Sequence, residues 1–209
     1  MRIVLISLTL ILLNFQSFCQ DKFLFDWNGK SFIDTLKSNG VDTVCTIKSY
    51  CVGCKIKWDN EAEVCENKDW RYFNLLVFWK HSGINYYKKF NNCFEYETKQ
   101  LDSIGFLDYF IDNRAVISKE KIKSAVGIEV INGDTSLIIY DVDLYNKLDI
   151  TMEIHGDKYQ NEFYDYNFDT SFNKLYGRRN VQLRLFALYR MIYKEYADIE
   201  RRYKPKIVK

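Results

Sequence analysis

The chain has little of several residue types on which common functional sites depend. Of its 209 residues, one is proline, at position 205, and two are histidine, His81 and His155. A Ser/Pro linker is therefore excluded, and so is a His-Glu-x-x-His zinc helix. Each histidine lies beside a predicted glycine turn, where an exposed histidine is commonplace.

Catalytic motifs with a fixed local pattern are also missing. The sequence contains no Gly-x-Ser-x-Gly elbow, no phosphate-binding glycine loop and no dinucleotide fingerprint, and no cofactor is expected. A hydrolase built on two carboxylates stays open, because its two acids can lie anywhere in the sequence. Nucleic-acid binding is not expected, since the net charge is only +2 and the chain has the features of an exported protein.

A secretory signal is predicted at residues 1–19. One positive charge precedes an apolar run at residues 3–13, which is too short to span a bilayer. Cleavage after Cys19 leaves a mature domain, residues 20–209, in the periplasm, on the cell surface or secreted. Alternatively Cys19 is the lipid-bearing residue of a lipoprotein, although Phe18 before it disfavours that processing. No second apolar run suggests a transmembrane span.

The spacing of apolar residues predicts an α+β domain with an antiparallel sheet of hairpins. Turn residues between strand-like runs place the hairpin turns at 80–83, 132–134 and 156–157. A short N-terminal helix, a middle helix and a long amphipathic C-terminal helix are expected at 30–38, 101–113 and 180–203. We expect a single exported domain, with a Cys-rich subdomain at 20–98 as an option.

The cysteines are the most informative chemical feature. Five remain after cleavage, all in the N-terminal half of the mature chain: Cys45, Cys51, Cys54, Cys65 and Cys93. Export favours disulfides, so we expect two bridges, each stabilising the fold by about 2–4 kcal/mol, and one thiol that is free or intermolecular. The sequence does not choose the pairing.

The spacing Cys51-Val-Gly-Cys54 leaves two functional alternatives open. A thioredoxin-like redox site needs this motif at the start of a helix and a facing cis-proline, whereas a strand-like run follows here. A zinc site could add Cys65 and Cys93, or His81 in place of one thiol, but no second Cys-x2-Cys pair is present. Haem attachment is excluded because no histidine follows the second cysteine.

Oxygen ligands for a metal are found in one short pattern. Asp165, Asn167 and Asp169 alternate as in the first part of an EF-hand calcium loop. The turn glycine of that loop is replaced by Thr170, and its bidentate glutamate by Tyr176. No metal is therefore assigned, and these three residues are weak candidates beside the alternative of a strand end with acidic turns.

Charge is distributed unevenly along the chain. Residues 20–173 contain 18 Lys and Arg against 25 Asp and Glu, whereas residues 174–209 contain 11 against 3. The two regions could face each other in the fold. Alternatively, the basic helix contacts an envelope protein, an anionic glycan or a lipid surface. The residues predicted for that contact are Arg184, Arg190, Lys194, Arg201 and Arg202.

These patterns predict an exported cell-envelope protein that acts as a non-catalytic binding or structural domain, stabilised by disulfides. The heavy use of Lys, Asn, Ile, Tyr and Phe is typical of an AT-rich genome and favours a bacterial envelope. Two other classes stay open: a metal-dependent or carboxylate-based envelope hydrolase, and a thiol-active redox protein using Cys51 and Cys54.

Overall fold

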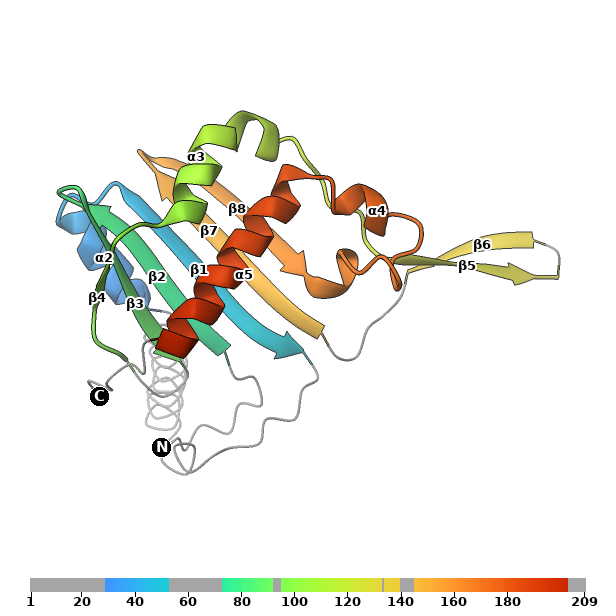
Figure 1. The fold of residues 1–209 in the computed structure, drawn as a ribbon, viewed down its shortest axis with the longest axis horizontal. Coiled ribbons are helices and arrows are strands. Elements are labelled where there is room, and N and C mark those ends of the chain that lie inside the picture. Colours follow the sequence, from blue (N-terminus) through green and yellow to red (C-terminus); the bar gives the residue numbers. More distant parts are fainter. Residues whose placement is uncertain (1–28, 53–72, 92–94, 133, 140–144, 203–209) are drawn as a thin grey trace, which may run out of the picture.

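The structure is a computed structural model that describes residues 29–52, 73–91, 95–132, 134–139 and 145–202. Its central element is a six-stranded antiparallel sheet (Figure 1). Across the sheet the strands are β4 (Lys99–Leu101), β3 (Ile84–Asn91), β2 (Phe73–His81), β1 (Thr43–Val52), β7 (Tyr145–Ile154) and β8 (Asp157–Tyr164). The predicted α+β class with an antiparallel hairpin sheet is confirmed.

Helices cover both faces of the sheet. On one face lie α3 (Gly105–Ile117) and α5 (Arg184–Arg202), with α5 crossing the strands in Figure 1. The short helix α2 (Lys30–Ser38) lies on the other face. A 3-10 turn, η2 (Asp165–Asn167), and the single-turn helix α4 (Gly177–Asn180) connect β8 to α5. Among the described residues, no helix is both long and apolar enough to cross a membrane.

Two of the sheet hairpins close through two-residue turns in the left-handed conformation. Ser82 and Gly83 have φ values of 51° and 78°, and His155 and Gly156 have values of 51° and 87°. Such turns match the right-handed twist of paired strands, which explains why a glycine marks each one in the sequence. Strands from both halves of the chain, β1 to β3 and β7 to β8, belong to one sheet.

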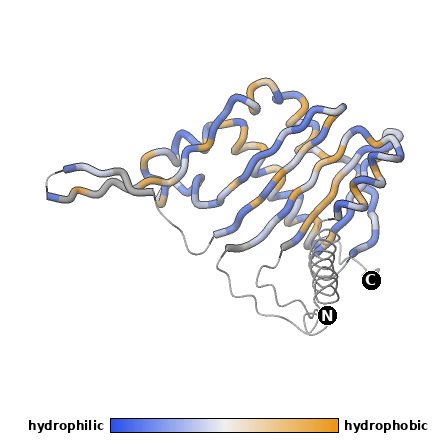
Figure 2. The backbone as a smooth tube through the Cα atoms, turned by 180° about the vertical axis from the view of Figure 1, so that it is seen from behind, coloured by the Kyte–Doolittle hydropathy of each residue, from blue (hydrophilic) through white to orange (hydrophobic). Residues whose placement is uncertain are grey.

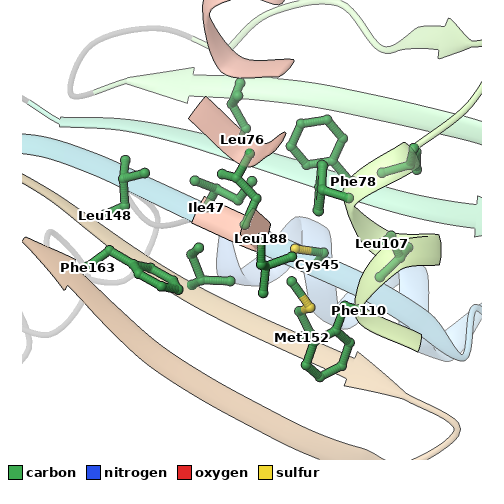
Figure 3. Packing of buried hydrophobic residues seen from close by; sticks show 14 of the residues in the cluster. Cys45, Ile47, Leu76, Phe78, Leu107, Phe110, Leu148, Met152, Phe163 and Leu188 are labelled. Atoms are coloured by element: carbon green, nitrogen blue, oxygen red, sulfur yellow. The ribbon is translucent and has the colours of Figure 1, made fainter. Parts of the chain in front are cut away.

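The main core lies between the sheet and the pair α3 and α5 (Figure 3). Alternate residues of the central strands point into it, including Cys45 and Ile47 of β1 and Met152 of β7. Leu188 of α5 and Phe110 of α3 fill it from the helix side. This period of two in the strands leaves the intervening residues for the opposite face of the sheet.

A second, smaller core attaches α2 to the opposite face, over β1, β2 and β3. Leu36 is buried there, and the ring of Phe32 packs edge-on against Trp79 with centroids 5.3 Å apart. The helix ends in a left-handed Gly40, with φ of 80°, and the N–H of Val41 donates to the carbonyl of Leu36. This is the C-terminal motif that glycine favours, and it confirms the predicted helix.

Three buried asparagines fix the connection that leads into α5. Asn180 donates from its side-chain amide to the carbonyls of Lys123 and Asn167, at 2.8 and 2.9 Å. Asn173 donates to the Asn167 carbonyl at 3.0 Å, and the Asn167 amide oxygen accepts from the N–H of Ala125. Because buried backbone groups need partners, these amides hold the segment after α3 against the segment after β8.

The predicted bounds of two helices were wrong. The middle helix was expected at 101–113, but Leu101 belongs to β4 and α3 begins at Gly105. The last helix was expected from Asn180, but α5 begins at Arg184, where the carboxylate of Glu120 accepts from the N–H groups of Arg184 and Leu185. A carboxylate at a helix N-terminus satisfies free N–H groups and interacts favourably with the helix dipole.

The remaining strands, β5 (Val126–Ile131) and β6 (Asp134–Ile139), form a separate two-stranded hairpin. It projects from the body of the protein in Figure 1. Its turn contains Asn132, which has φ of 53°, as the Asn-Gly pair in the sequence indicated. The side chain of Val130 is 65% exposed.

Candidate functional site

The side chains on the face of the sheet opposite α3 and α5 differ between its two halves. Over β2 and β3 they are mostly apolar and covered by α2, and Lys88 of β3 lies over the rings of Phe32 and Phe90. Over β1, β7 and β8 they are polar apart from Val44, which belongs to the α2 core, and we call the polar array the outer polar face. It consists of Thr46, Lys48, Tyr50, Lys147, Asp149, Thr151, Glu153, Lys158, Gln160, Glu162 and Tyr164.

The strand register arranges this face in rows across three strands. Directly opposite residues form the rows Tyr50–Lys147–Tyr164, Lys48–Asp149–Glu162 and Thr46–Thr151–Gln160, and Glu153 and Lys158 pair beyond them. In β7 the burial pattern alternates strictly from Lys147 to Ile154, with the core residues between the polar ones. Figure 2 views the molecule from this side, where hydrophilic and hydrophobic positions alternate along the strands.

Lys147 lies on the middle strand of the outer polar face, in the row at its tyrosine-bordered end. Its side chain is 12% exposed, and its ammonium group is 2.9 Å from Glu162 Oε2 and 3.1 Å from Asp149 Oδ1. The same nitrogen is 5.4 Å from the ring centroid of Tyr50 and 5.3 Å from that of Tyr164. Two carboxylates and two aromatic rings therefore surround one lysine, and each contact favours its charged form.

The hydrogen bonds of this cluster fix its protonation states. The Tyr164 hydroxyl donates to Glu162 Oε2 at 2.6 Å, and this bond, together with the one from Lys147, lowers the pKa of Glu162. Burial acts to lower the pKa of Lys147, but bonds to Tyr50, Glu162 and Asp149 raise it overall above its ordinary value. Burial and the Glu162 contact raise the pKa of Tyr164 to about 12.

The hydrogen bonds around Glu162 argue against this residue as a general acid. Asp149 and Glu162 are opposite each other on β7 and β8, as a pair of hydrolytic carboxylates could be. A general acid that works near neutral pH needs a raised carboxyl pKa. The pKa of Glu162 is instead lowered, because Tyr164 and Lys147 donate to its carboxylate.

A cluster of tyrosines borders one end of the outer polar face. The ring centroids of Tyr145 and Tyr164 are 5.5 Å apart, and those of Tyr145 and Tyr166 are 5.2 Å apart at an interplanar angle of 85°. Tyr164 and Tyr166 are 5.6 Å apart, and Phe172 packs against Tyr166. All four residues are half-buried.

The basic residues predicted for partner contact lie on α5. Arg184, Arg190, Lys194 and Arg201 are exposed, and Arg190, Lys194 and Arg201 follow at helical spacing along one side. Arg190 lies 6.0 Å from the ring centroid of Phe186, and Arg201 pairs with Asp198 at 3.4 Å. Arg202 is the last residue of the helix, and its side chain lies outside the described part.

The structure describes the side chain of one predicted disulfide cysteine, Cys45. Cys45 is a free thiol, fully buried in the main core, and burial raises its pKa. Cys54, Cys65 and Cys93 and the side chain of Cys51 lie outside the described residues, so the two predicted bridges stay a prediction. The odd number of cysteines and the burial of Cys45 identify this residue as the candidate for the unpaired thiol.

The three weak metal candidates take part in local hydrogen bonds. Asp165 Oδ2 accepts from the N–H and the side-chain amide of Asn146, while Asn167 is buried and accepts from Ala125. Asp169 Oδ1 accepts from the N–H and hydroxyl of Ser171, as the first residue of a turn. Within the described ranges, no group of three or more His, Cys, Asp or Glu side chains could hold a metal ion.

Lys147, Asp149, Glu162 and Tyr164 were not predicted from the sequence as site residues. The hairpin turn predicted at 156–157 marked only the end of β7, whereas the strand begins at Tyr145. The alternation of polar and apolar residues in Lys147-Leu-Asp149-Ile was the signal that could have extended the strand. Pairing of β7 with β1, about a hundred residues earlier, is not readable from such local patterns.

Comparison of the chain with protein-family models, with curated proteins and with solved structures gave no match.

Proposed function

We propose that this protein is an exported, non-catalytic binding domain of the cell envelope, and that it binds through the outer polar face. The observation that carries the proposal is the Lys147 cluster, in which two carboxylates and two tyrosine rings surround one lysine. Side chains held by their own hydrogen bonds present polar groups in fixed positions, which lowers the entropic cost of binding. Export rests on the predicted signal at residues 1–19.

Co-sedimentation with envelope fractions tests the proposal. The mature protein is mixed separately with peptidoglycan sacculi, outer-membrane vesicles and phospholipid vesicles, and the pelleted fraction is measured. The test variant is Gln160→Arg, because Gln160 is exposed in the row Thr46–Thr151–Gln160 and arginine there adds bulk and charge. The matched control is Gln182→Arg, an exposed position between α4 and α5.

Binding that is lost in Gln160→Arg and retained in Gln182→Arg supports the proposal. Equal binding by both variants, or no binding to any fraction, contradicts it. Release of soluble products from the pelleted material would contradict the non-catalytic part and favour the carboxylate-based hydrolase.

A second candidate surface is the basic side of α5. There Arg190 and Lys194 are exposed beside Tyr193, whose side chain is 52% exposed. A cationic helix side with an aromatic residue is suited to an anionic lipid or glycan. The double variant Arg190→Ser and Lys194→Ser separates the two surfaces. If this variant loses vesicle binding and the Gln160→Arg variant still binds vesicles, the binding surface is α5 and not the outer polar face.

A further inference from the structure

We infer that the ligand of the outer polar face is a neutral oligosaccharide. This inference rests on the proposed function and names the ligand class of the same surface. Three features of the face favour this chemistry: its charge balance, its tyrosine rings and the dimensions of its hydrogen-bonding array.

The charges of the outer polar face balance within the face. Its three lysines, Lys48, Lys147 and Lys158, equal in number its three carboxylates, Asp149, Glu153 and Glu162. Lys147 contacts Asp149 and Glu162, and Glu153 also pairs with Lys37 of α2 at 2.5 Å. An ionic ligand would gain little net attraction here and would have to compete with these pairs. The binding of a neutral ligand does not depend on net charge, so the equal numbers of lysines and carboxylates do not weaken it.

The tyrosine cluster provides the apolar part of the surface. A pyranose ring carries C–H groups on its flat sides and hydroxyl groups around its rim, so it requires flat apolar area next to polar groups. Tyr145, Tyr164 and Tyr166 form a half-buried group of rings at the end of the face, and Tyr164 also belongs to the row Tyr50–Lys147–Tyr164. Tyrosine supplies such area together with a polar hydroxyl and with few side-chain torsions to restrict.

The polar groups beyond the tyrosines suit the hydroxyls of an extended chain. The Glu162 side chain is 55% exposed, so its second oxygen remains available as an acceptor. Gln160 and Thr151 bond to each other at 3.2 Å and lie one row further along the strands. From Lys147 to Glu153 the face extends over about 20 Å at the rise of a β-strand, which exceeds the size of one sugar ring.

Binding of defined oligosaccharides tests the inference. The mature protein is titrated with the neutral hexasaccharides of glucose (α and β linked), xylose, mannose and N-acetylglucosamine, and with the acidic hexasaccharide of galacturonic acid. Backbone amide shifts in NMR spectra locate the site, and calorimetry gives the affinity. We expect at least one neutral hexasaccharide to bind, with the largest amide shifts in β1, β7 and β8.

Two variants connect the binding to the tyrosines. Tyr164→Ala is expected to weaken binding about tenfold, because it removes one stacking surface. Ile111→Ala, which removes an exposed apolar side chain from α3 on the other face of the sheet, is the matched control and leaves affinity unchanged. Unchanged NMR spectra outside the site show that each variant is folded. Equal losses in both variants would overturn the assignment to this face.

The dependence on salt separates a neutral ligand from a charged one. Affinity for a neutral ligand should change less than about twofold between NaCl concentrations of about 0.05 and 0.5 M, because screening acts on charge pairs. Preference for the acidic hexasaccharide, or no binding to any neutral one, overturns the inference. If envelope binding is still lost in Gln160→Arg in that case, the proposed function stands and only the ligand class fails.

Discussion

Tyr164 donates its hydroxyl hydrogen to Glu162, two residues earlier on the same strand, over 2.6 Å. The bond connects the tyrosine cluster to the Lys147 cluster. It also lowers the pKa of the Glu162 carboxyl from its ordinary 4.5, with the second contribution from Lys147. A single substitution can therefore test whether the outer polar face is organised as described.

Tyr164→Phe should raise the pKa of Glu162 toward 4.5, because the stronger of the two donors is removed. A folded-state pKa below the unfolded value means that Glu162 stabilises the fold above the unfolded pKa, and that this stabilisation is lost as the pH falls through the folded pKa. The variant should consequently lose less stability on acidification. Carboxyl carbon NMR shifts follow the titration directly.

The control for this titration is Tyr145→Phe. Tyr145 contacts the ring of Tyr164 but belongs to the other strand, β7. Removing the Tyr145 hydroxyl should leave the pKa of Glu162 unchanged. If both variants shift the titration equally, the Tyr164 hydroxyl is not the cause of the lowered pKa.

Glu120 stabilises the start of α5 from the segment that follows α3. Its two carboxylate oxygens accept from the N–H groups of Arg184 and Leu185 at 3.1 and 2.8 Å. Glu120→Ala should lower the free energy of unfolding by about 1 kcal/mol, as loss of other helix caps does. Glu120→Gln retains one of the two acceptors and should cost less than Glu120→Ala, although it loses the charge and the second acceptor.

Urea unfolding measures this effect as a shift in the midpoint at an unchanged slope. Lys119→Ala is the control, because Lys119 is an exposed neighbour outside the cap. A loss in Lys119→Ala as large as that in Glu120→Ala would contradict a specific capping role.

Two glycines that each begin a helix should respond to alanine in opposite directions. A Cβ at Gly177 would lie 2.9 Å from the Cα of Thr170 and 3.2 Å from the Asp169 carbonyl oxygen, both backbone atoms. At Gly105 the nearest atom is the flexible end of Met191, at 3.8 Å. Gly177→Ala should cost about 1–3 kcal/mol through overpacking. Gly105→Ala should be neutral or stabilise by up to about 1 kcal/mol.

The pair is compared by thermal and urea unfolding of the two variants. Since both glycines begin a helix, the difference between the variants reports the space around the Cβ rather than helix propensity. Equal stability of Gly177→Ala and the parent protein would mean that the turn between η2 and α4 can move away from α4.

Helices and hairpins could be predicted where the residues that specify them are neighbours in the sequence. The helix α2 was predicted with its observed bounds because amphipathic spacing and Gly40 lie next to each other in the sequence. The hairpins followed from glycine turns for the same reason. The start of α5 was misplaced because Asn180, which was taken as its first residue, bonds instead to Lys123 and Asn167.

The candidate site could not be predicted because it depends on distant pairing. Tyr50 and Lys147 are opposite each other because β1 pairs with β7. The sequence of neither strand indicates which other strand it pairs with. The same holds for the free thiol. Cys45 points into the main core on the same side of β1 as Ile47. Which side of β1 faces the core is set by the packing of α3 and α5, so the sequence of β1 alone does not show whether Cys45 is buried or in a disulfide.

Cys45 should react with thiol reagents only when the protein is unfolded. It is fully buried, and burial raises the pKa of its thiol, so little reactive thiolate is present at neutral pH. If the other four cysteines form the two predicted bridges, unreduced protein should gain no iodoacetamide adduct when folded and one in denaturant. Peptide mass spectrometry should place that adduct on Cys45. Cys45→Ala should abolish it and cost about 1–2 kcal/mol, since it leaves a small cavity. An adduct at another cysteine, or Cys45 found in a bridge, would contradict its role as the unpaired thiol.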